Sequence, residues 1–325
     1  MTGLDEDSLI ADMFAPLATD AGADALGDDA ATFAGGDGDI VVTCDALAAG
    51  VHFFADDPPA AIAAKALRVN LSDLAAKGAE PFGYLLALAL GEGASDAWAR
   101  EFAGGLAADN ARYGVSLLGG DTLRASPGGG TTIAVTAFGR VPSGAVVRRR
   151  AAKPGDALFV TGTIGDGALG LLARQGKLCA LADPHRAALT DCYLHPDPPV
   201  AAWRAVRDHA RAAMDVSDGL VGDLAKLCRA AGVGALMDAD AVPFSQAVAA
   251  AIALDPANRD TALTGGDDYQ ILAAVPPEAA DAFAATATAC GARATRIGAI
   301  EAGEGVRIIA GGNAMALKDG RFQHF

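Results

Sequence analysis

Apolar runs of strand length alternate with amphipathic stretches of helical length along the whole chain. The runs predict strands at 39–45, 84–90, 115–118, 131–141, 157–162, 212–216, 234–239 and 269–275, with two short strands nearer the end. The stretches predict helices at 8–18, 58–78, 95–113, from about 165, and at 184–194, 199–211, 219–231, 245–262 and 277–290. Strands that alternate with helices in both halves indicate an α/β (α+β) fold with two mixed α/β domains.

The helix predicted before Gly78 carries a polar stripe beside its apolar stripe. It begins with two prolines and ends at the glycine, which is the usual punctuation of a helix. Asn70, Asp73 and Lys77 fall on one face, roughly a quarter-turn from a row of leucines. We expect this polar face to point toward a specific site.

The length of the chain favours two domains. A chain of 325 residues exceeds the size at which a single core usually stops growing. Residues 141–156 are rich in turn formers and charge, and we expect the chain to cross there between the domains. The predicted domains are 1–146 and 147–325.

Composition and charge exclude several classes of partner. The net charge is −15 and the pI is about 4.6, which argues against a nucleic-acid groove or an anionic membrane surface. No apolar run approaches the length of about 18 residues that a membrane span needs, and the acidic N-terminal residues are unlike a signal peptide. Five scattered cysteines without a CxxC pair favour a reducing cytoplasm.

Aspartates gather at short turns next to apolar runs. The set comprises Asp28, Asp29, Asp45, Asp73, Asp121, Asp215, Asp218, Asp267 and Asp268. Taken singly, each is most simply a solvated turn or a helix cap. If they converge, they must bind cations or take up protons, and carboxylates beside a phosphate are typical of Mg²⁺ sites. Their number therefore predicts magnesium that holds a polyphosphate.

Other motifs leave alternatives open. The glycine-rich stretch 162–170 lacks the lysine and hydroxyl of a P-loop, so it is either a tight turn or a phosphate contact. His52 alone is most simply a core or rim residue. Arg148–Arg150 are either a solvated linker or a phosphate clamp, and Lys65 and Lys77 are expected at the surface.

Several motifs, in order, resemble the thiamine-monophosphate kinase family over nearly the whole chain. They are "LGDDAA", "TCDALAAGVHF", "KALRVNLSDLAAKGAEP", "LLGGDT", "AKPGDALFVTGTIGDGALGL", "MDVSDGL" and "LTGGDDYQI". Three of them also mark the wider superfamily of aminoimidazole-ribonucleotide-synthetase-like ATP-binding proteins. The resemblance implies an N-terminal domain that binds ATP and Mg²⁺, pairs its sheet with that of a second subunit in a homodimer, and forms an ATP cleft with the C-terminal domain.

The resemblance also implies the reaction and the residues that perform it. The reaction is ATP-dependent phosphorylation of thiamine monophosphate to thiamine diphosphate, assisted by several Mg²⁺ ions. The implied metal-binding residues are Asp29, Thr43, Cys44, Asp45, Asp73, Asp121, Asp215 and Asp218. The implied ATP-binding residues are Gly120, Asp121, Arg149 and Ser217, and the implied substrate-binding residues are His52, Asp267 and Phe322.

The acceptor itself makes a general base unnecessary. A phosphate monoester has a second pKa of about 6, so at neutral pH its oxygen is already ionised. We therefore expect direct in-line attack on the γ-phosphate and no catalytic side chain that removes a proton.

Four positions depart from the family pattern. Cys44 stands where threonine is usual, Asp267 is shorter than a common glutamate, and Gln270 replaces an acidic residue. Phe322 stands near the place where relatives have a tryptophan. Two alternatives remain: another ATP-dependent enzyme of the superfamily, akin to aminoimidazole ribonucleotide synthetase or selenophosphate synthetase, or a non-catalytic protein that binds divalent ions.

Overall fold

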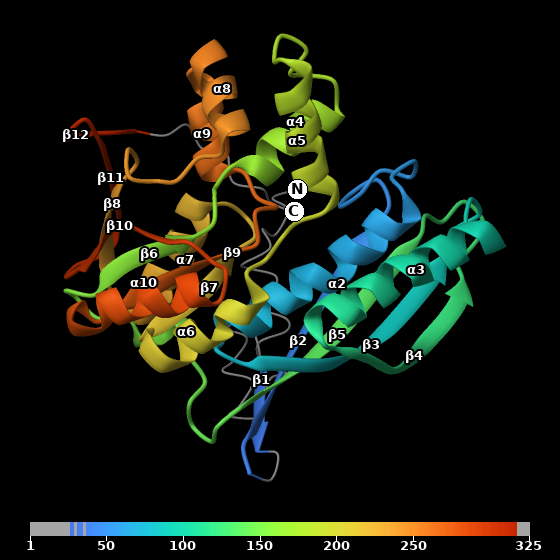
Figure 1. The fold of residues 1–325 in the computed structure, drawn as a ribbon, viewed down its shortest axis with the longest axis horizontal. Helices are drawn as coiled ribbons and strands as arrows, with labels where there is room; N and C mark the ends of the chain where they lie inside the picture. Colours follow the sequence, from blue (N-terminus) through green and yellow to red (C-terminus); the bar gives the residue numbers. More distant parts are fainter. Residues whose placement is uncertain (1–26, 29–30, 35–36, 317–325) are drawn as a thin grey trace, which may run out of the picture.

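The fold consists of two β-sheets with a long helix packed between them (Figure 1). The structure is a computed structural model that describes residues 27–28, 31–34 and 37–316. The helix predicted at 8–18 and the site residues Asp29 and Phe322 lie outside the described residues. The prediction of two mixed α/β units is confirmed.

The first sheet has five strands in the order β1-β2-β5-β3-β4. Their bounds are β1 Ala31–Ala34, β2 Asp39–Ala48, β3 Glu80–Leu90, β4 Ser116–Arg124 and β5 Thr132–Val141. Only the β3–β4 pair is parallel. Helices α2 (Pro59–Ala76) and α3 (Asp96–Tyr113) cover one face, and β4 is an exposed edge strand.

The second sheet has seven strands in the order β12-β11-β8-β10-β6-β9-β7. Their bounds are β6 Ala157–Thr161, β7 Ala212–Val216, β8 Gly234–Asp238, β9 Gln270–Val275, β10 Ala294–Glu301, β11 Gly305–Ala310 and β12 Asn313–Ala314. Strands β6 and β7 are buried along their whole length, because helices cover both faces.

The helices of this second half divide among the two faces of the sheet and a separate layer. Their bounds are α4 Asp166–Arg174, α5 Asp183–Leu194, α6 Trp203–His209, α7 Leu220–Ala231, α8 Gln246–Leu254, α9 Ala257–Thr264 and α10 Ala280–Ala289. Helix α7 packs on one face, and α6 and α10 pack on the other. Helices α4, α5, α8 and α9 share a smaller core at the top of Figure 1.

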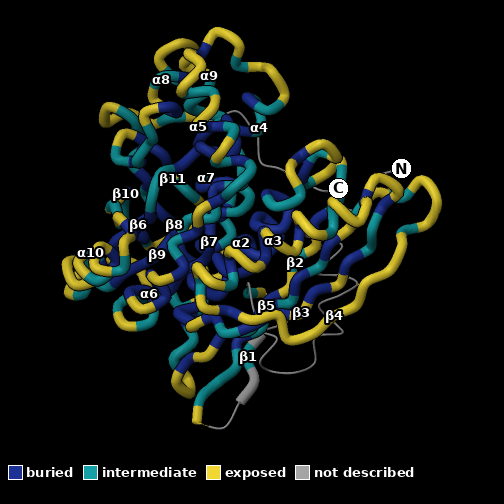
Figure 2. Tube along the Cα trace, turned by 45° about the vertical axis from the view of Figure 1, so that its right-hand side comes forward, coloured by how far each residue is buried: buried dark blue, intermediate teal, exposed yellow. Residues whose placement is uncertain are grey.

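Helix α2 is buried on all sides, because it packs on the first sheet and its last turn enters the core of the second (Figure 2). Its polar residues are therefore buried too. The expectation that Lys65 and Lys77 lie at the surface is wrong: their exposed fractions are 3% and 0%. Both ammonium groups have acceptors from the second half of the chain.

The strands differ from the prediction in two places, whereas the helices around 245–262 agree with it. Strand β4 continues through "GGDT" to Arg124, since an exposed edge strand needs no apolar pattern. The helices predicted around 245–262 are α8 and α9, which Asp255 and Pro256 separate. Up to residue 316, where the described part of the chain ends, three strands follow α10, whereas two short strands were predicted.

None of the helices in the described part of the chain is long and apolar enough to cross a membrane.

Candidate functional site

Four aspartates from three segments meet where α2 passes the second sheet. Asp45 lies on β2, Asp73 on α2, Asp215 on β7, and Asp218 in the turn after β7. The charges of Asp45 and Asp215 both act on Asp73, and the charge of Asp218 acts on Asp45. The prediction that distant acidic residues converge is met by these four.

Hydrogen bonds fix the side chains of this carboxylate cluster. The Thr43 hydroxyl donates to Asp73 Oδ2 at 2.5 Å. The Ser72 hydroxyl donates to Asp215 Oδ2 at 2.6 Å and so joins α2 to β7. The arrangement is therefore held by the fold before any ligand binds.

Burial makes the ionised form of these carboxyl groups costly. Burial first, and then the charge of Asp218, raises the pKa of Asp45 to about 6. Burial raises the pKa of Asp215 to about 7, although the Ser72 hydrogen bond lowers it. Burial and the charges of Asp215 and Asp45 raise the pKa of Asp73 well above its ordinary value. A bound cation would relieve both the desolvation and the repulsion.

A second aspartate fixes the turn that carries Ser217 and Asp218. Asp223 Oδ2 accepts the backbone N–H groups of both residues at 3.0 Å. Lys226 lies 3.2 Å from Asp223 Oδ1 and also pairs with Asp218. Asp223 and Lys226 were missed in the sequence, where they lie on what reads as an ordinary amphipathic helix.

Asp28 differs from the cluster because cations surround it. Lys77 Nζ donates to Asp28 Oδ1 at 2.7 Å, Arg149 Nε lies 3.7 Å from the same oxygen, and Arg148 lies 4.0 Å from the other. Arg149 also lowers the pKa of Asp215. The structure thus places Arg149 between Asp28 and the carboxylate cluster and does not leave it in a solvated linker.

The donor chemistry of the cluster fits a hard cation such as Mg²⁺. Within the described ranges, no group of three or more His, Cys, Asp or Glu side chains is placed so that it could hold a metal ion by itself. Mg²⁺ beside a nucleotide takes one or two carboxylates, and phosphate oxygens and water complete its coordination. All the donors of the cluster are oxygen atoms, and burial, together with the charges of neighbouring aspartates, raises the pKa values of Asp45 and Asp215.

Cys44 and Asp121 lie on the other face of the first sheet. Cys44 on β2 pairs with Thr136 on β5, whose hydroxyl donates a hydrogen bond to Cys44 Sγ at 3.3 Å. Thr136 also pairs with the exposed Leu85 on β3, so all three side chains lie on the exposed face of the sheet. Leu85 pairs with Gly119 on β4, and Asp121 lies two residues after Gly119, so its side chain points to the same face as Leu85. Asp45 is adjacent to Cys44 on β2, so its side chain points to the opposite face, which the helices cover. Within one chain, therefore, Asp121 is not beside the cluster, and only the backbone of residue 44 can face it.

Gly120 has a backbone role on the same strand. Its φ is +150°, and a Cβ there would lie 1.8 Å from the carbonyl oxygen of Leu86. Any other residue would force the parallel β3–β4 pair apart.

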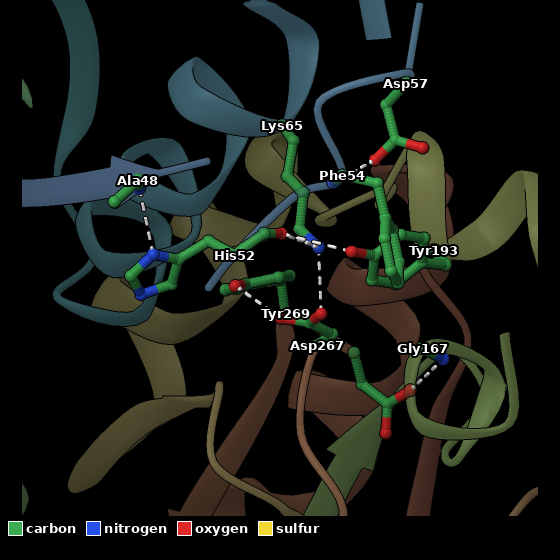
Figure 3. Close-up of polar contacts among 10 residues, drawn as sticks. Ala48, His52, Phe54, Asp57, Lys65, Gly167, Tyr193, Asp267 and Tyr269 are labelled. Atoms are coloured by element: carbon green, nitrogen blue, oxygen red, sulfur yellow. Dashed lines mark hydrogen bonds and ion pairs between the residues drawn. The ribbon is translucent and has the colours of Figure 1, made fainter. Parts of the chain in front are cut away.

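His52 and Asp267 lie near each other at the opposite end of α2 from Lys77 (Figure 3). His52 Nδ1 accepts the backbone N–H of Ala48 at 3.0 Å, so the ring proton lies on Nε2. Asp267 accepts from the Tyr269 hydroxyl at 2.9 Å and from Lys65 Nζ at 2.8 Å. Two of the three residues predicted to bind substrate are thus brought together by Lys65, which also donates to the His52 carbonyl.

The turn that holds Asp267 has unusual backbone geometry. Asp267 and Tyr269 have φ values of +72° and +52°, a region that non-glycine residues seldom adopt. The turn is pinned because Asp267 N–H donates to the Ser217 carbonyl at 2.9 Å. A Cβ on Gly266 would lie 2.1 Å from that carbonyl oxygen. The strain orients Asp267 and ties it to the turn of Asp218.

The glycine-rich stretch 162–170 forms the start of α4 and binds a carboxylate of the protein itself. Asp268 accepts the backbone N–H groups of Gly165 and Gly167 at 2.7 and 3.0 Å. Of the two alternatives for this stretch, the structure favours the tight turn. From the sequence, Asp268 was counted among the aspartates that could hold magnesium, whereas its side chain binds the backbone at the start of α4.

Comparisons with known proteins extend over both sheets. The family AIR synthase related protein, N-terminal domain, matches residues 27–141, and AIR synthase related protein, C-terminal domain, matches residues 153–311.

Individual relatives agree with one another. The chain is 45% identical over 283 residues to thiamine-monophosphate kinase of Caulobacter vibrioides. This alignment covers 86% of this chain and 79% of that protein. The chain is 38% identical over 287 residues to thiamine-monophosphate kinase of Salmonella typhimurium, covering 88% and 86%. Among solved structures, "AaThiL complexed with AMPPCP and TMP" has a TM-score of 0.86 and 30% identity, and the match covers 100% of this chain and 98% of that one.

Proposed function

The chain belongs to the thiamine-monophosphate kinase family, and we propose that it transfers the γ-phosphate of ATP directly to thiamine monophosphate with the help of Mg²⁺ at its carboxylate cluster. The relative with the TM-score of 0.86 was solved with AMPPCP and TMP, an ATP analogue and the acceptor. The observation that carries the proposal for the cluster is the convergence of Asp45, Asp73 and Asp215, whose carboxyl pKa values are raised.

The cluster would hold the metal at Asp45, Asp73, Asp215 and Asp218. When bound, Mg²⁺ would shield the two reacting anions from each other and stabilise charge on the transferring group. The protein contributes rigid placement: Thr43 orients Asp73, Ser72 orients Asp215, and the Asp223 hydrogen bonds fix the turn of Asp218.

The remaining ATP contacts are proposed at Arg149 and Ser217. The Arg149 guanidinium lies near Asp28 and Asp215, where it can pair with a phosphate once metal has offset part of the carboxylate charge. Ser217 adjoins Asp218 in the turn that Asp223 fixes. Both residues are therefore at the edge of the cluster where a polyphosphate would lie.

His52 and Asp267 would bind the thiamine end of the acceptor. Tyr269 connects this end to the cluster, because its pKa is raised by burial and also by the charges of Asp267, Asp45 and Asp215. The acceptor phosphate is already ionised at neutral pH, so the proposal needs no side chain to remove a proton.

Gly120 and Asp121 are proposed to act across a homodimer. Strand β4 is exposed along its whole length, and the leucines at 117, 118 and 123 on this strand and at 85 on the neighbouring β3 are exposed. Pairing of this surface with a second copy would cover the leucines and bring Asp121 to a shared site. The proposed domains are 1–146 and 147–325, and five free cysteines support a cytoplasmic location.

Replacement of Asp73 by asparagine tests the cluster. We expect Asp73→Asn to form thiamine diphosphate at less than about 1% of the normal rate while it keeps its fold, since the change removes a buried charge. The matched control is Asp281→Asn, at an exposed position on α10. Normal turnover by Asp73→Asn in Mg²⁺ would refute the assignment. ATP hydrolysis that does not depend on thiamine monophosphate would favour a synthetase.

A further inference from the structure

Lys65 is a buried cation at the point where three separate segments meet the thiamine end of the site. It lies on α2 with only 3% of its surface exposed. Its Nζ donates to Asp267 Oδ2 at 2.8 Å and to the His52 carbonyl at 3.2 Å. It also lies 3.9 Å from the centre of the Tyr193 ring. Figure 3 shows these groups around one ammonium.

The three contacts use the whole binding capacity of the ammonium. Lys65 has three N–H donors, and two go to oxygen acceptors while the third side faces an aromatic ring. A buried lysine is stable only when it is paired in this way. The buried helix α2 fixes the backbone of Lys65, and the three contacts hold its flexible side chain so that Nζ has one defined position.

The partners of Lys65 also bind one another. The Tyr193 hydroxyl donates to the His52 carbonyl at 3.3 Å, so helix α5 and Lys65 hold the same peptide group. The Tyr269 hydroxyl donates to Asp267 Oδ1, so both oxygens of that carboxylate have a donor. Asp267 therefore has one defined orientation despite its strained backbone.

Helix α2 links this end to the carboxylate cluster. Lys65 and Ser72 are seven residues apart, which puts them on the same face with a rise of about 10 Å between them. Ser72 contacts Asp215 in the cluster, and Lys65 contacts Asp267. One rigid element thus sets the separation between the groups assigned to phosphate transfer and those assigned to thiamine.

We propose that Lys65 is a positioning residue for the acceptor: its ammonium fixes the Asp267 carboxylate and the His52 turn in the geometry that binds thiamine monophosphate. The proposal rests on the assignment of His52 and Asp267 to the acceptor. Lys65 acts through Asp267 and does not touch ATP, so its loss affects one substrate and not the other.

A neighbouring buried ion pair provides the matched control for a merely structural role. Arg68 lies one turn further along α2 and donates to both oxygens of Asp109 at 2.8 and 2.7 Å, and to the Pro196 carbonyl. It joins the same two halves of the chain but contacts neither His52 nor Asp267. A loss of stability alone would appear equally in variants of Arg68 and Lys65.

The test is a double-mutant cycle of Lys65→Met and Asp267→Asn with Arg68→Met as control, read as separate KM values for the two substrates. We expect Lys65→Met to raise the KM for thiamine monophosphate about tenfold to a hundredfold, the loss of one charge-assisted hydrogen bond. The KM for ATP should stay within roughly twofold. Adding Lys65→Met to Asp267→Asn should give little further change. Lys65→Arg should restore part of the affinity.

The outcomes of this cycle either support the positioning role of Lys65 or contradict it. Equal effects of Lys65→Met and Arg68→Met, a rise in both KM values, or full additivity with Asp267→Asn would overturn the role of Lys65. If Asp267→Asn raises the KM for thiamine monophosphate and Lys65→Met does not, the role of Lys65 is overturned, whereas the assignment of Asp267 to the acceptor stands. An unchanged KM in Asp267→Asn would overturn the assignment and the inference together. If Lys65→Met does not fold, Lys65→Gln, which keeps a donor, replaces it in the same cycle.

Discussion

The Ser72 hydroxyl on α2 donates a 2.6 Å hydrogen bond to Asp215 Oδ2 on β7, and the two residues are 143 positions apart in the chain. The bond lowers the pKa of a carboxyl group that burial raises to about 7. It therefore favours the ionised form of Asp215, which is the form that can bind metal, near neutral pH.

Ser72→Ala should shift the pH dependence of the reaction. Without the hydroxyl, the pKa of Asp215 rises further above its ordinary value, so its ionised form appears only at higher pH. We expect the acidic limb of kcat/KM for MgATP to move upward by about one pH unit. Profiles of rate against pH check this, with Ser72→Thr as the variant that keeps the hydroxyl. A limb that does not move would show that the bond leaves Asp215 unaffected.

The metal-free protein should lose stability as pH rises. The folded pKa values of Asp45 and Asp215, about 6 and about 7, lie above the ordinary aspartate value of 3.8. Between about pH 4 and 7 the folded state therefore keeps protons that the unfolded state releases, so these groups favour unfolding increasingly as pH rises through that range. Melting curves recorded with Mg²⁺ and with a chelator in its place should show that Mg²⁺ raises Tm more at pH 8 than at pH 5.

Asp215→Asn should stabilise the metal-free protein at pH 8 and abolish turnover. Asparagine carries no charge and can still accept from Ser72, so the gain is on the order of 4 kcal/mol at pH 8 and on the order of 2 kcal/mol at pH 5, and it approaches zero only below about pH 4, where the unfolded state is protonated too. Denaturant unfolding at both pH values measures the difference. If Asp215→Asn instead destabilises the protein at pH 8, the carboxylate is a structural partner and not a metal ligand.

Local signals in the sequence were enough to predict most elements of the fold. Helix α2 begins and ends where its prolines and Gly78 predict, because these residues restrict the backbone whatever surrounds them. The length of strand β4 was underestimated, because the segment "GGDT" has no apolar pattern and pairs with β3 only through its backbone. Pairing of this kind depends on a partner strand that is distant in the sequence.

The sequence predicted the acidic residues of the candidate site but not the positions of its lysines. Asp45 and Asp73 were found because aspartates at the ends of apolar runs are conspicuous. Lys65 was misplaced at the surface, since burial of a lysine depends on acceptors such as Asp267 that lie 202 positions away. Asp121 was grouped with Asp45 because a sequence motif does not say to which face of a sheet a side chain points. The register of the strands shows that the two side chains lie on opposite faces.

Thr43 and Cys44 are adjacent but should respond differently to substitution. Thr43→Val keeps the shape of the side chain and removes the 2.5 Å hydrogen bond to Asp73, so we expect a loss in kcat/KM of about tenfold or more. Cys44→Ala should stay within roughly twofold, because the thiol lies on the opposite face beside Thr136. Steady-state kinetics of both variants check this. A large effect of Cys44→Ala would mean that the thiol, and not the backbone of residue 44, serves the metal.

The exposed leucines of β4 should hold two copies of the chain together. Leu118 and Leu123 are each 53% exposed on an edge strand, an arrangement that isolated subunits seldom leave uncovered. Leu118→Asp should convert a dimer to a monomer in light-scattering measurements, whereas Leu254→Asp, at an equally exposed leucine on α8, should not. Turnover should fall with the dimer, because Asp121 on the same strand can contribute only through a second copy. A fully active monomer would therefore remove Asp121 from the site.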